Sequence, residues 1–451
     1  MLKRFKKGGI HPDPMKLTAG RPIMATKAPS EVSLLLGQHI GAPAKCIVKP
    51  GEMVAAGQKI AEAGGFVSAP VHTPIAGKVK KIDLVRDAQG LWKEAVIIEA
   101  VTAEKEETTQ PATETIDFSD SNPLRSAHEI EALTPKEIVD IVGEAGIVGL
   151  GGASFPTRVK LSIPEGKKAD IFIINGAECE PFLTCDDALM RRYPSEILSG
   201  VRFLMKAVSA PRAIIGVEAN KPEAIAALTN AAMMVPEIEV VPLRTRYPQG
   251  GEKQLIQALT GRVVPAGGLP IDAGVVVDNV ATAFAVYRAV KFGEPLMKRV
   301  VTVTGVSVDK GGNFVAANGM KTADLIDMAG GIPKNTGKVI SGGPMMGRAM
   351  SDVSAPLVKG SGGVLLVPEK NAFRGVVSPC IRCCRCVEAC PMSLEPYLLQ
   401  TLGEFNVPEE AKEAGVLNCM ECGCCSYVCP SNRPIVDYIR LSKLQIRAQK
   451  K

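Results

Sequence analysis

Two cysteine runs near the end of this 451-residue chain carry its clearest chemistry. The first run holds Cys380, Cys383, Cys386 and Cys390 before Pro391, and the second holds Cys419, Cys422, Cys425 and Cys429 before Pro430. Each run therefore has the pattern C-x2-C-x2-C-x3-C-P, the spacing that holds cubane iron–sulfur clusters. Three thiolates on one tight loop can bind three irons of a cube, while the fourth thiolate comes from elsewhere in the chain.

The fourth cysteine of each run binds the other cluster in proteins with two such runs. The spacing thus predicts one [4Fe–4S] cluster on Cys380, Cys383, Cys386 and Cys429, and a second on Cys419, Cys422, Cys425 and Cys390. Cys384 and Cys424 fall outside the pattern and are interpreted as non-ligating thiols. A pair of zinc sites is the first alternative, but zinc ribbons separate C-x2-C pairs by a longer spacer. Disulfides are the second, and nothing in the chain indicates export to an oxidising compartment.

The composition is that of a globular protein, with 46% hydrophobic and 22% charged residues, and the length predicts about three domains. Only 4% of the residues are aromatic, which argues against a stacking surface for nucleic acid. No apolar run approaches the roughly 18 residues of a membrane-spanning helix. The basic start of the chain lacks the apolar stretch of a signal peptide. We therefore expect no transmembrane segment and a reducing, cytoplasmic environment.

The elements that must position the clusters begin with an N-terminal segment and a β-rich domain, together over residues 1–101. Glycines at 51, 57 and 77 alternate with aliphatic residues, so short strands should fold back on one another. This pattern resembles the barrel-sandwich of biotinyl and lipoyl domains. Those carrier domains display a modified lysine at a hairpin tip, whereas residues 61–73 here contain none, so no carrier function is expected. The polar, acidic residues 102–130 are predicted to form a linker.

Residues 131–296 have the pattern of an α/β domain. Apolar strands at 171–174, 213–217 and 274–277 alternate with helical segments, which predicts a largely parallel sheet covered on both faces. Polar residues follow the strands, and ligands bind at the carboxyl ends of strands in such sheets. The glycine-rich stretch 149–152 could bring backbone N–H groups close to a phosphate. On its own, such a stretch is more often an ordinary turn.

The segments over residues 297–370 resemble a β-grasp module, and residues 371–451 are predicted to form a helical cluster domain. Met345 and Met346 are interpreted as core residues of the β-grasp domain. The stretch between the two cysteine runs is rich in Leu, Glu and Ala and should be helical. Apolar and basic residues alternate at helical spacing over 435–451. This terminal helix could contact anionic lipid or a partner, although a solvated helix is the simpler interpretation.

Two motifs of the middle domain carry a resemblance to a known family. Residues 149–156 (GLGGASFP) and residues 175–181 (NGAECEP) resemble the flavin- and NADH-binding subunit of respiratory complex I and of related hydrogenases. With the lysine-free barrel, GIHP at 9–12 and the cysteine runs, nearly the full chain resembles the C subunit (RnfC) of the Rnf ion-translocating ferredoxin:NAD oxidoreductases. The resemblance implies a multidomain α/β protein with a lipoyl-like barrel-sandwich, an α/β flavin domain, an SLBB-like β-grasp domain and an α-helical dicluster ferredoxin domain.

The resemblance also implies a non-covalent FMN, with NAD(H) as substrate. The FMN phosphate would lie along Gly149, Gly151, Gly152 and Lys160. Asn175 and Asn279 would lie near the ribityl chain or the flavin ring. Glu178 and Glu180 would sit close to the nicotinamide or its ribose, and Phe155 could stack on the nucleotide. One departure weakens the transfer of these contacts: where complex I has Tyr-x-x-Gly-Glu-Glu, Gly251 here replaces one of the two acids.

The implied function is electron transfer between NAD(H), FMN and the two clusters, coupled to ion pumping by partner subunits. A flavin is the expected converter because nicotinamide delivers two electrons at once and each cluster accepts one. The expected partners are the membrane subunits of the complex and its ferredoxin-like subunit. The expected place is peripheral, on the cytoplasmic face of the cell membrane. No nucleic-acid partner is expected.

Three alternatives remain from the sequence. One is the diaphorase subunit of a soluble NAD-linked hydrogenase or formate dehydrogenase, which is not expected to carry the barrel. Another is an iron–sulfur relay scaffold without flavin. The third is a resemblance to the A subunit of the sodium-pumping NADH:quinone reductase, which shares the barrel and the middle fold but lacks the cysteine runs.

Overall fold

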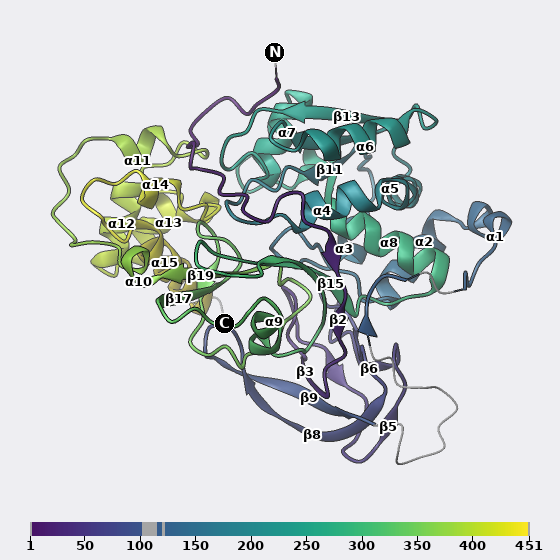
Figure 1. Cartoon of the computed structure of the whole chain (residues 1–451). Helices are drawn as coiled ribbons and strands as arrows, with labels where there is room; N and C mark the ends of the chain where they lie inside the picture. The colour runs from purple at the N-terminus through teal and green to yellow at the C-terminus, as the bar shows by residue number, and fades with distance from the viewer. Residues whose placement is uncertain (1, 102–114, 120–121, 450–451) are drawn as a thin grey trace.

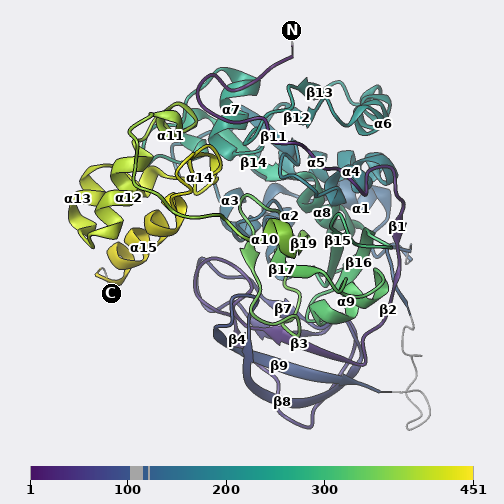
Figure 2. The ribbon, with the colours of Figure 1, turned by 60° about the vertical axis from the view of Figure 1, so that its left-hand side comes forward.

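The computed structural model describes residues 2–101, 115–119 and 122–449. Figure 1 shows the α/β domain at the top, a second mixed-sheet domain beneath it, the barrel at the bottom and the helical C-terminal domain at one side. The view turned by 60° in Figure 2 shows the C-terminal domain beside the α/β domain and the barrel below the mixed sheet. The four predicted domains therefore follow one another in the predicted order.

The barrel consists of two antiparallel sheets. The first contains β3 (Glu31–Leu35), β9 (Trp92–Ala100), β8 (Gly77–Arg86) and β5 (Met53–Val54), and the second contains β4 (Lys45–Cys46), β6 (Lys59–Glu62) and β7 (Val71–His72). Val32, Leu34, Ile60 and Ile98 are fully buried between the sheets. Alternate residues of a strand face opposite sides, so these aliphatic positions share the core between the sheets. The adjacent Leu35, Ala61 and Ile97 are buried as well. The barrel-sandwich prediction is confirmed.

His72 makes the stability of this barrel depend on pH. It is buried on β7, its Nδ1 has no hydrogen-bond partner, and burial, together with the charges of Lys359 and Lys59, lowers its pKa to about 3. Below about pH 6.5, the ordinary pKa of histidine, His72 therefore binds a proton in the unfolded chain but stays neutral in the folded barrel. Stability is present above pH 6.5 and is lost as the pH falls towards 3, at up to about 1.4 kcal/mol per pH unit.

We expect His72→Leu to remove this part of the pH dependence. Trp92, the single tryptophan of the chain, lies on β9 and reports barrel unfolding by its fluorescence. Urea unfolding at pH 6.5 and pH 5 should show the unsubstituted barrel losing about 2 kcal/mol more than the variant. An equal loss in both proteins would mean that His72 is not the responsible group.

The α/β domain is built on a parallel sheet in the order β13 (Ile238–Leu243), β12 (Ala213–Glu218), β11 (Ile171–Gly176) and β14 (Val275–Asn279). One face packs on α2 (Pro135–Glu144), α5 (Pro194–Val208), α6 (Pro222–Ala232) and α8 (Val280–Phe292). The other face packs on α7 (Glu252–Thr260). Phe172 and Ile174 face the first core, whereas Ile171 and Ile173 face the second. Both faces are covered, as predicted.

Shorter elements connect this sheet to its surroundings. They are α1 (Ala127–Ala132), α3 (Thr157–Leu161), α4 (Cys185–Arg192) and the 3-10 turn η1 (Pro270–Ala273). The start of α2 carries a capping box, in which the hydroxyl of Thr134 accepts from the backbone N–H of Glu137 and the Glu137 carboxylate accepts from the N–H of Thr134. Such reciprocal bonds satisfy two otherwise unpaired donors and stop the helix from fraying.

The predicted linker over residues 102–130 needs a correction in its described part. Residues 102–114 and 120–121 lie outside the described residues. Within the rest, β10 (Thr115–Ile116) pairs antiparallel with β2 (Thr26–Lys27), and Ile116 and Phe118 are buried in the main core. The ring of Phe118 packs edge-on against Phe284 of α8 at 5.0 Å between centroids. Two apolar residues in a polar run were enough to dock this segment, and the polar composition around them concealed it.

The mixed sheet of the β-grasp domain also recruits the N-terminus. Its order is β1 (Ile23–Met24), β16 (Gly312–Ala317), β15 (Lys298–Thr304), β19 (Gly363–Pro368), β17 (Thr336–Ser341) and β18 (Arg348–Ala349), with α9 (Thr322–Met328) beside it. β1 pairs in parallel with β16, so residues 23–24 belong to this sheet and not to the barrel. Only from β3 onward does the chain enter the barrel proper.

The C-terminal domain is helical, as predicted. It contains α11 (Arg385–Glu388), α12 (Pro396–Glu404), α13 (Pro408–Glu413), the 3-10 turn η2 (Val416–Asn418), α14 (Cys424–Tyr427) and α15 (Ile435–Ala448). The short helix α10 (Glu369–Ala372) packs instead on β17 and β19 of the mixed sheet. The terminal helix α15 packs its Ile435, Ile439 and Ile446 into the core of this domain with Leu399 of α12. Across the described parts of the chain, no helix has the length and apolar character needed to cross a membrane.

Candidate functional site

The cysteines of the two runs gather around two separate pockets in the C-terminal domain. We call these the inner pocket and the outer pocket. The inner pocket is lined by Cys390, Cys419, Cys422, Cys424 and Cys425, and the outer pocket by Cys380, Cys383, Cys384, Cys386 and Cys429. Each pocket thus takes three cysteines of the C-x2-C-x2-C pattern and one extra cysteine from one run, and the last cysteine of the other run. The eight cysteines of the pattern are grouped as in the predicted ligand sets, and the role of each thiol as a ligand stays a prediction. All 13 cysteines of the chain are free, so no disulfide competes for these thiols.

The two loops that carry the thiols repeat the same backbone shape. Arg382 and Glu421 occupy equivalent positions and have φ values of 55° and 59°, in the left-handed region. Cys384 and Gly423 are also equivalent, with φ values of 61° and 80°. Left-handed residues turn the chain tightly, so that three thiols of one loop can face one point. Cys384 therefore occupies a turn position, which agrees with its interpretation as a non-ligating thiol.

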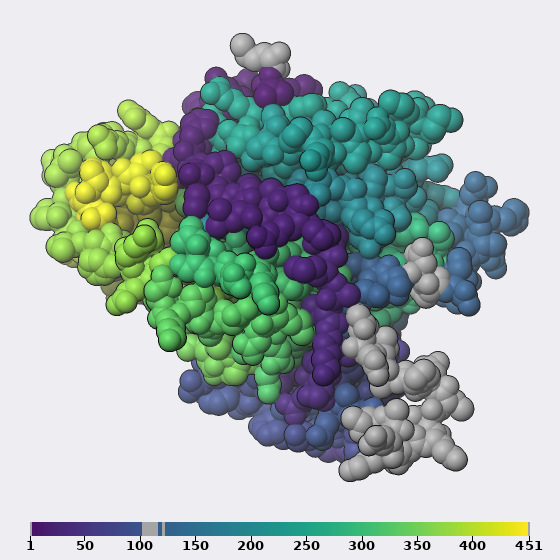
Figure 3. All heavy atoms as spheres, in the orientation of Figure 1, coloured from purple at the N-terminus to yellow at the C-terminus, as the bar shows by residue number. Residues whose placement is uncertain are grey.

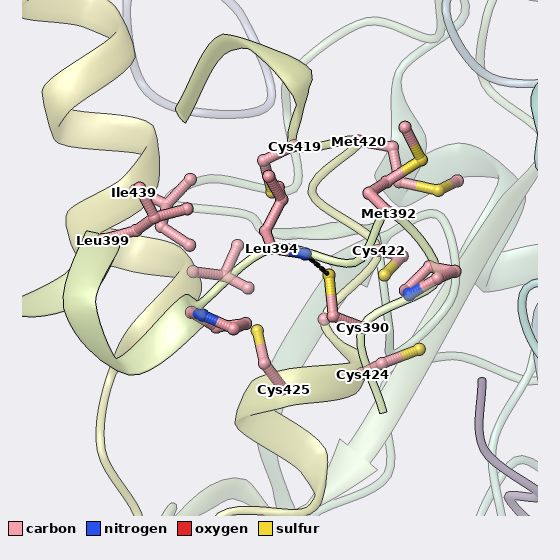
Figure 4. A pocket seen from close by; sticks show the side chains of 14 residues that line it. Cys390, Met392, Leu394, Leu399, Cys419, Met420, Cys422, Cys424, Cys425 and Ile439 are labelled. Carbon is pink, nitrogen blue, oxygen red and sulfur yellow. Dashed lines mark hydrogen bonds between the residues drawn. The ribbon is translucent and has the colours of Figure 1, made fainter. Parts of the chain in front are cut away.

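The inner pocket is a dry, sulfur-rich site. Figure 4 shows the thiols of Cys390 and Cys422 facing the same space, while the side chain of Cys424 points to the side opposite Cys425. Cys390, Cys422 and Cys425 are buried, and burial raises the pKa of Cys419 to about 11. Buried thiols keep their protons unless a metal displaces them. A positively charged iron centre supplies that displacement, so the residues present fit a cluster.

Backbone and charged groups support the inner pocket. The N–H groups of Leu394 and Glu421 donate to the sulfurs of Cys390 and Cys419 at 3.4 and 3.3 Å. The carboxylate of Glu421 is held by Arg440 and Lys443 of α15, at 3.0 and 2.9 Å. Hydrogen bonds to cluster sulfurs are one means by which proteins set reduction potentials. The basic side chains of α15 that make these bonds thus act inside the domain, and no lipid is needed to explain them.

The outer pocket lies closer to solvent. Cys380 and Cys383 are exposed, and Cys386 and Cys429 are half-buried. Arg382, Arg385 and Arg433 line the same pocket and make it positively charged. A cluster held there would lie near the protein surface, where a partner could reach it.

The predicted flavin residues gather at the carboxyl end of the parallel sheet. Asn175 lies at the end of β11 and Asn279 ends β14, and the Nδ2 of Asn279 donates to the carbonyl of Asn175 at 3.3 Å. The glycine-rich loop lies against them, since a Cβ on Gly151 would be 3.3 Å from the Cβ of Asn279. The N–H of Leu150 donates to the hydroxyl of Thr282 at 2.9 Å, which ties the loop to the start of α8. The glycine-rich loop, the ends of β11 and β14 and the start of α8 therefore lie together at the carboxyl edge of the sheet, which we call the flavin edge.

The charges at this edge can receive a phosphate and a polar ring. Gly151 and Gly152 are exposed, and nothing lies within 4 Å of a Cβ built on Gly152, so the loop has open space beside it. Lys160 donates to the carbonyl of Val277 at 2.9 Å, which brings its ammonium group to the same edge. Asp278 is buried, its Oδ2 has no partner, and burial raises its pKa. A buried oxygen without a partner in the protein can bond to a polar group of a ligand. The open space beside the loop, Lys160 and Asp278 therefore fit FMN.

Glu178 and Glu180 are already engaged within the protein. Glu178 accepts from the backbone N–H of Asp186 at 2.8 Å, at the start of α4, where the helix dipole favours a negative charge. Glu180 accepts from the N–H groups of Met345 and Met346 at 2.6 and 3.0 Å, and burial raises its pKa. Both carboxylates therefore hold backbone in this structure. Their expected role near the nicotinamide stays a prediction, as does stacking by the half-buried Phe155.

A short loop joins the flavin edge to the inner pocket. The Nδ2 of Asn175 donates to the carbonyl of Gly250 at 2.8 Å. Three residues earlier, the hydroxyl of Tyr247 donates to the carbonyl of Cys422 at 2.7 Å. Gln254 donates to the carbonyl of Pro391 at 3.3 Å. Residues 247–254 therefore touch both sites.

The structure explains why position 251 is a glycine. It lies in residues 247–254, which form the junction between the flavin edge and the inner pocket. A Cβ placed on Gly251 would lie 2.6 Å from the methyl group of Met420 in the cluster loop and 2.6 Å from Oε1 of Gln254. The acid found here in the complex I pattern would have to displace Met420. The glycine thus lets the cluster loop approach the flavin domain closely.

Two residues of the site were not assigned from the sequence. Asp278 precedes Asn279 at the end of β14, and its strand-end position is the signal that could have identified it. Tyr247 lies in the segment that departs from the complex I pattern, 175 residues before the cysteine whose carbonyl it contacts. No local pattern predicts a contact over that separation.

Comparisons with known proteins match each domain. Family models match in the order RnfC barrel sandwich hybrid domain (residues 3–103), Nuo51 FMN-binding domain (142–288), SLBB domain (300–349) and 4Fe-4S dicluster domain (372–430). The C subunit of the proton-translocating ferredoxin:NAD(+) oxidoreductase complex of Clostridium ljungdahlii is 43% identical, covering 99% of this chain and 95% of that protein. The C subunit of the Na(+)-translocating complex of Acetobacterium woodii is 42% identical over 99% and 98%. The C subunit of an ion-translocating oxidoreductase complex of Rhodobacter capsulatus is 39% identical over 97% and 82%.

Proposed function

This chain belongs to the family of C subunits of the ion-translocating ferredoxin:NAD(+) oxidoreductase complexes, and from this premise we propose how it holds its cofactors and orders them. It is an electron-transfer protein of an oxidoreductase complex, with an FMN-binding domain and a 4Fe-4S dicluster domain. NAD is the substrate of the complex. The full-length match with C subunits argues against the diaphorase and the quinone-reductase alternatives.

The inner and outer pockets each hold one [4Fe–4S] cluster in this proposal. The ligands are the four cysteines of the spacing pattern that line each pocket, with Cys390 and Cys429 exchanged between the two runs. The alternation of ligands ties the two loops together, because each cluster bridges both runs. Cys384 and Cys424 take no part in ligation.

FMN lies at the carboxyl edge of the parallel sheet in this proposal. Gly149, Gly151, Gly152 and Lys160 receive the phosphate, and Asn175 and Asn279 contact the ribityl chain or the ring. Asp278 adds an acceptor for a ring or ribityl donor. When bound, the flavin converts the two-electron chemistry of nicotinamide into single-electron steps. Glu178, Glu180 and Phe155 would lie on the nicotinamide side.

The inner pocket is the neighbour of the flavin edge, and the single observation behind this order is the contact of Tyr247 with Cys422. Residues 247–254 touch Asn175 on one side and the inner cysteine loop on the other. The outer pocket, with its exposed thiols, is then the exit to a partner. We propose that this exit faces the membrane subunits or the ferredoxin-like partner of the complex, and that the chain is peripheral on the cytoplasmic face of the membrane.

An anaerobic NADH titration of native, cluster-loaded protein tests the proposed function. Absorbance is followed in the flavin and the iron–sulfur bands, with flavin, iron and sulfide measured beforehand. Bleaching of both bands is the expected result. If protein that contains flavin and both clusters shows no bleaching, the flavin edge does not accept electrons from NADH, and the chain acts as a relay without nicotinamide chemistry.

A further inference from the structure

The N-terminal residues 2–19 form a strap across the α/β domain, and this strap also reaches the cluster domain. Figure 3 shows it as a continuous band of atoms over the α/β domain and beside the C-terminal domain. Lys3 bridges in parallel to Leu243 at the end of β13. Lys16 fastens the other end, because its Nζ donates to the carbonyls of Glu178 and Leu183 at 2.8 and 2.6 Å. The strap is therefore anchored to the α/β domain at both ends.

Between these anchors the strap bonds to both sides of the junction. Ile10 pairs with Tyr247, and the two backbone N–H groups donate reciprocally at 2.8 and 3.0 Å. The adjacent Gly9 donates to the carbonyl of Ala389 at 2.9 Å. Tyr247 belongs to the loop beside the flavin edge, and Ala389 directly precedes Cys390 of the inner pocket. Two consecutive residues of the strap, Gly9 and Ile10, thus bond to the cluster domain and to the α/β domain, respectively.

Gly8 and Gly9 fit this position because they lack side chains. Their φ values are +66° and +82°, a conformation that costs other residues free energy. A Cβ on Gly8 would lie 2.4 Å from the carbonyl carbon of Cys390, and a Cβ on Gly9 would lie 2.8 Å from the carbonyl oxygen of Tyr247. The first of these neighbours is cluster-loop backbone, which would have to move by about 1 Å to reach the 3.4 Å of ordinary contact.

Phe5 and Arg246 lock the glycine pair in place. Phe5 is only 1% exposed, and the guanidinium of Arg246 lies over its ring at 4.7 Å from the centroid. The same guanidinium donates to the carbonyl of Gly8. A cation over a buried ring is a favourable and directional contact. The glycine pair therefore cannot slide along the loop without breaking this contact.

We infer that residues 2–19 are a positioning strap, whose Gly8–Gly9 pair sets the distance between the inner cluster pocket and the flavin edge. This inference rests on the proposed function for the identity of the two sites. At the glycine pair the strap acts through the backbone of Tyr247 and Ala389, not through a flavin-edge side chain or a cluster thiol. Its effect should fall on transfer between the sites and leave the loading of each site intact.

Gly8→Ala tests the inference, with Gly20→Ala as the matched control. Gly20 lies just beyond the strap and also has a positive φ, +75°, but nothing lies within 4 Å of its Cβ. Both variants therefore carry the same kind of backbone strain, and only Gly8→Ala pushes on the cluster loop. In stopped-flow mixing with NADH, flavin bleaching should keep its rate in both. Cluster bleaching should slow severalfold in Gly8→Ala alone, because electron transfer weakens as the distance between the sites grows.

Hydrogen exchange supplies a readout that is independent of activity. The amides of Gly9 and Tyr247 should exchange faster in Gly8→Ala and remain protected in Gly20→Ala. Phe5→Ala leaves both glycines in place, and it should slow cluster bleaching and speed hydrogen exchange by smaller factors. This variant replaces Gly8→Ala as the test if Gly8→Ala loses iron. Unchanged cluster bleaching and unchanged protection in both strap variants overturn the inference. If NADH bleaches no cluster even in the unsubstituted protein, the proposed function is wrong, and the exchange data alone then decide the strap.

Discussion

Replacing Cys425 with alanine is expected to stop NADH from reducing either cluster, whereas replacing Cys383 with alanine should leave one cluster fully reducible. Cys425 lines the inner pocket, which adjoins the loop that contacts the flavin edge, and Cys383 lines the outer pocket. Each variant should lose about half of its iron and sulfide, because each pocket binds one cluster. Flavin reduction by NADH should be unchanged in both. The measurement is anaerobic bleaching of the iron–sulfur band, normalised to iron content.

Cys46→Ala is the matched control for this pair. Cys46 is a free, half-buried cysteine of the barrel, and its thiol donates to the carbonyl of Val48 in the same domain. This variant should keep all its iron and its full bleaching. If the Cys383 variant were the one that loses NADH-driven bleaching while the Cys425 variant keeps it, the order of the two pockets would be reversed.

Gly151→Val is expected to remove FMN from the protein and with it all oxidation of NADH. A Cβ at this position would lie 3.3 Å from the Cβ of Asn279, and the two valine methyls would extend into the space beside the loop. That space is where we propose the phosphate and ribityl chain to lie. The affinity for FMN should fall by about a hundredfold or more, which is about 3 kcal/mol. The measurement is the flavin released from purified protein on denaturation, together with FMN titration of the flavin-free form.

Gly37→Val controls for the insertion of a branched side chain. Gly37 is exposed in the barrel region, and nothing lies within 4 Å of its Cβ. This variant should retain its flavin. Iron content should be normal in both proteins, since the cluster loops are untouched. A Gly151→Val protein that keeps its flavin would show that the glycine-rich loop does not line the FMN site.

The cluster ligands illustrate what local spacing can predict. The three-residue steps between cysteines determine which thiols share a loop, and the exchanged fourth ligand follows from the chemistry of two-cluster proteins. The pockets group the eight cysteines in this way. The barrel and the parallel sheet were predictable for a related reason. The glycines that alternate with aliphatic residues in the barrel, and the apolar run of β11, depend only on near neighbours in sequence, so both can be recognised before any partner is known.

Glu178 and Glu180 illustrate where this reasoning stops. Their place after a strand correctly suggested a position at the sheet edge, but their partners come from α4 and from the loop that holds Met345. The acidic segment 115–119 was assigned to a linker because two buried apolar residues do not outweigh a polar run. In each case the partner lies on another element. Whether these residues are buried therefore depends on how that element packs against them.

By itself the sequence determined the chemistry of this protein: which thiols can bind iron, which fold holds the flavin edge and which domains follow one another. Only the tertiary structure shows which cysteine pocket lies beside the carboxyl edge of the sheet, and the proposed order of the sites rests on it. Tyr247 and Cys422 are 175 positions apart, and Gly9 and Ala389 belong to opposite ends of the chain. Composition and periodicity depend on neighbours within a few residues, whereas the distance between two redox sites depends on packing between domains. That packing requires glycine at 8, 9 and 251 for reasons that become visible only when the opposing backbone and side chains are in place.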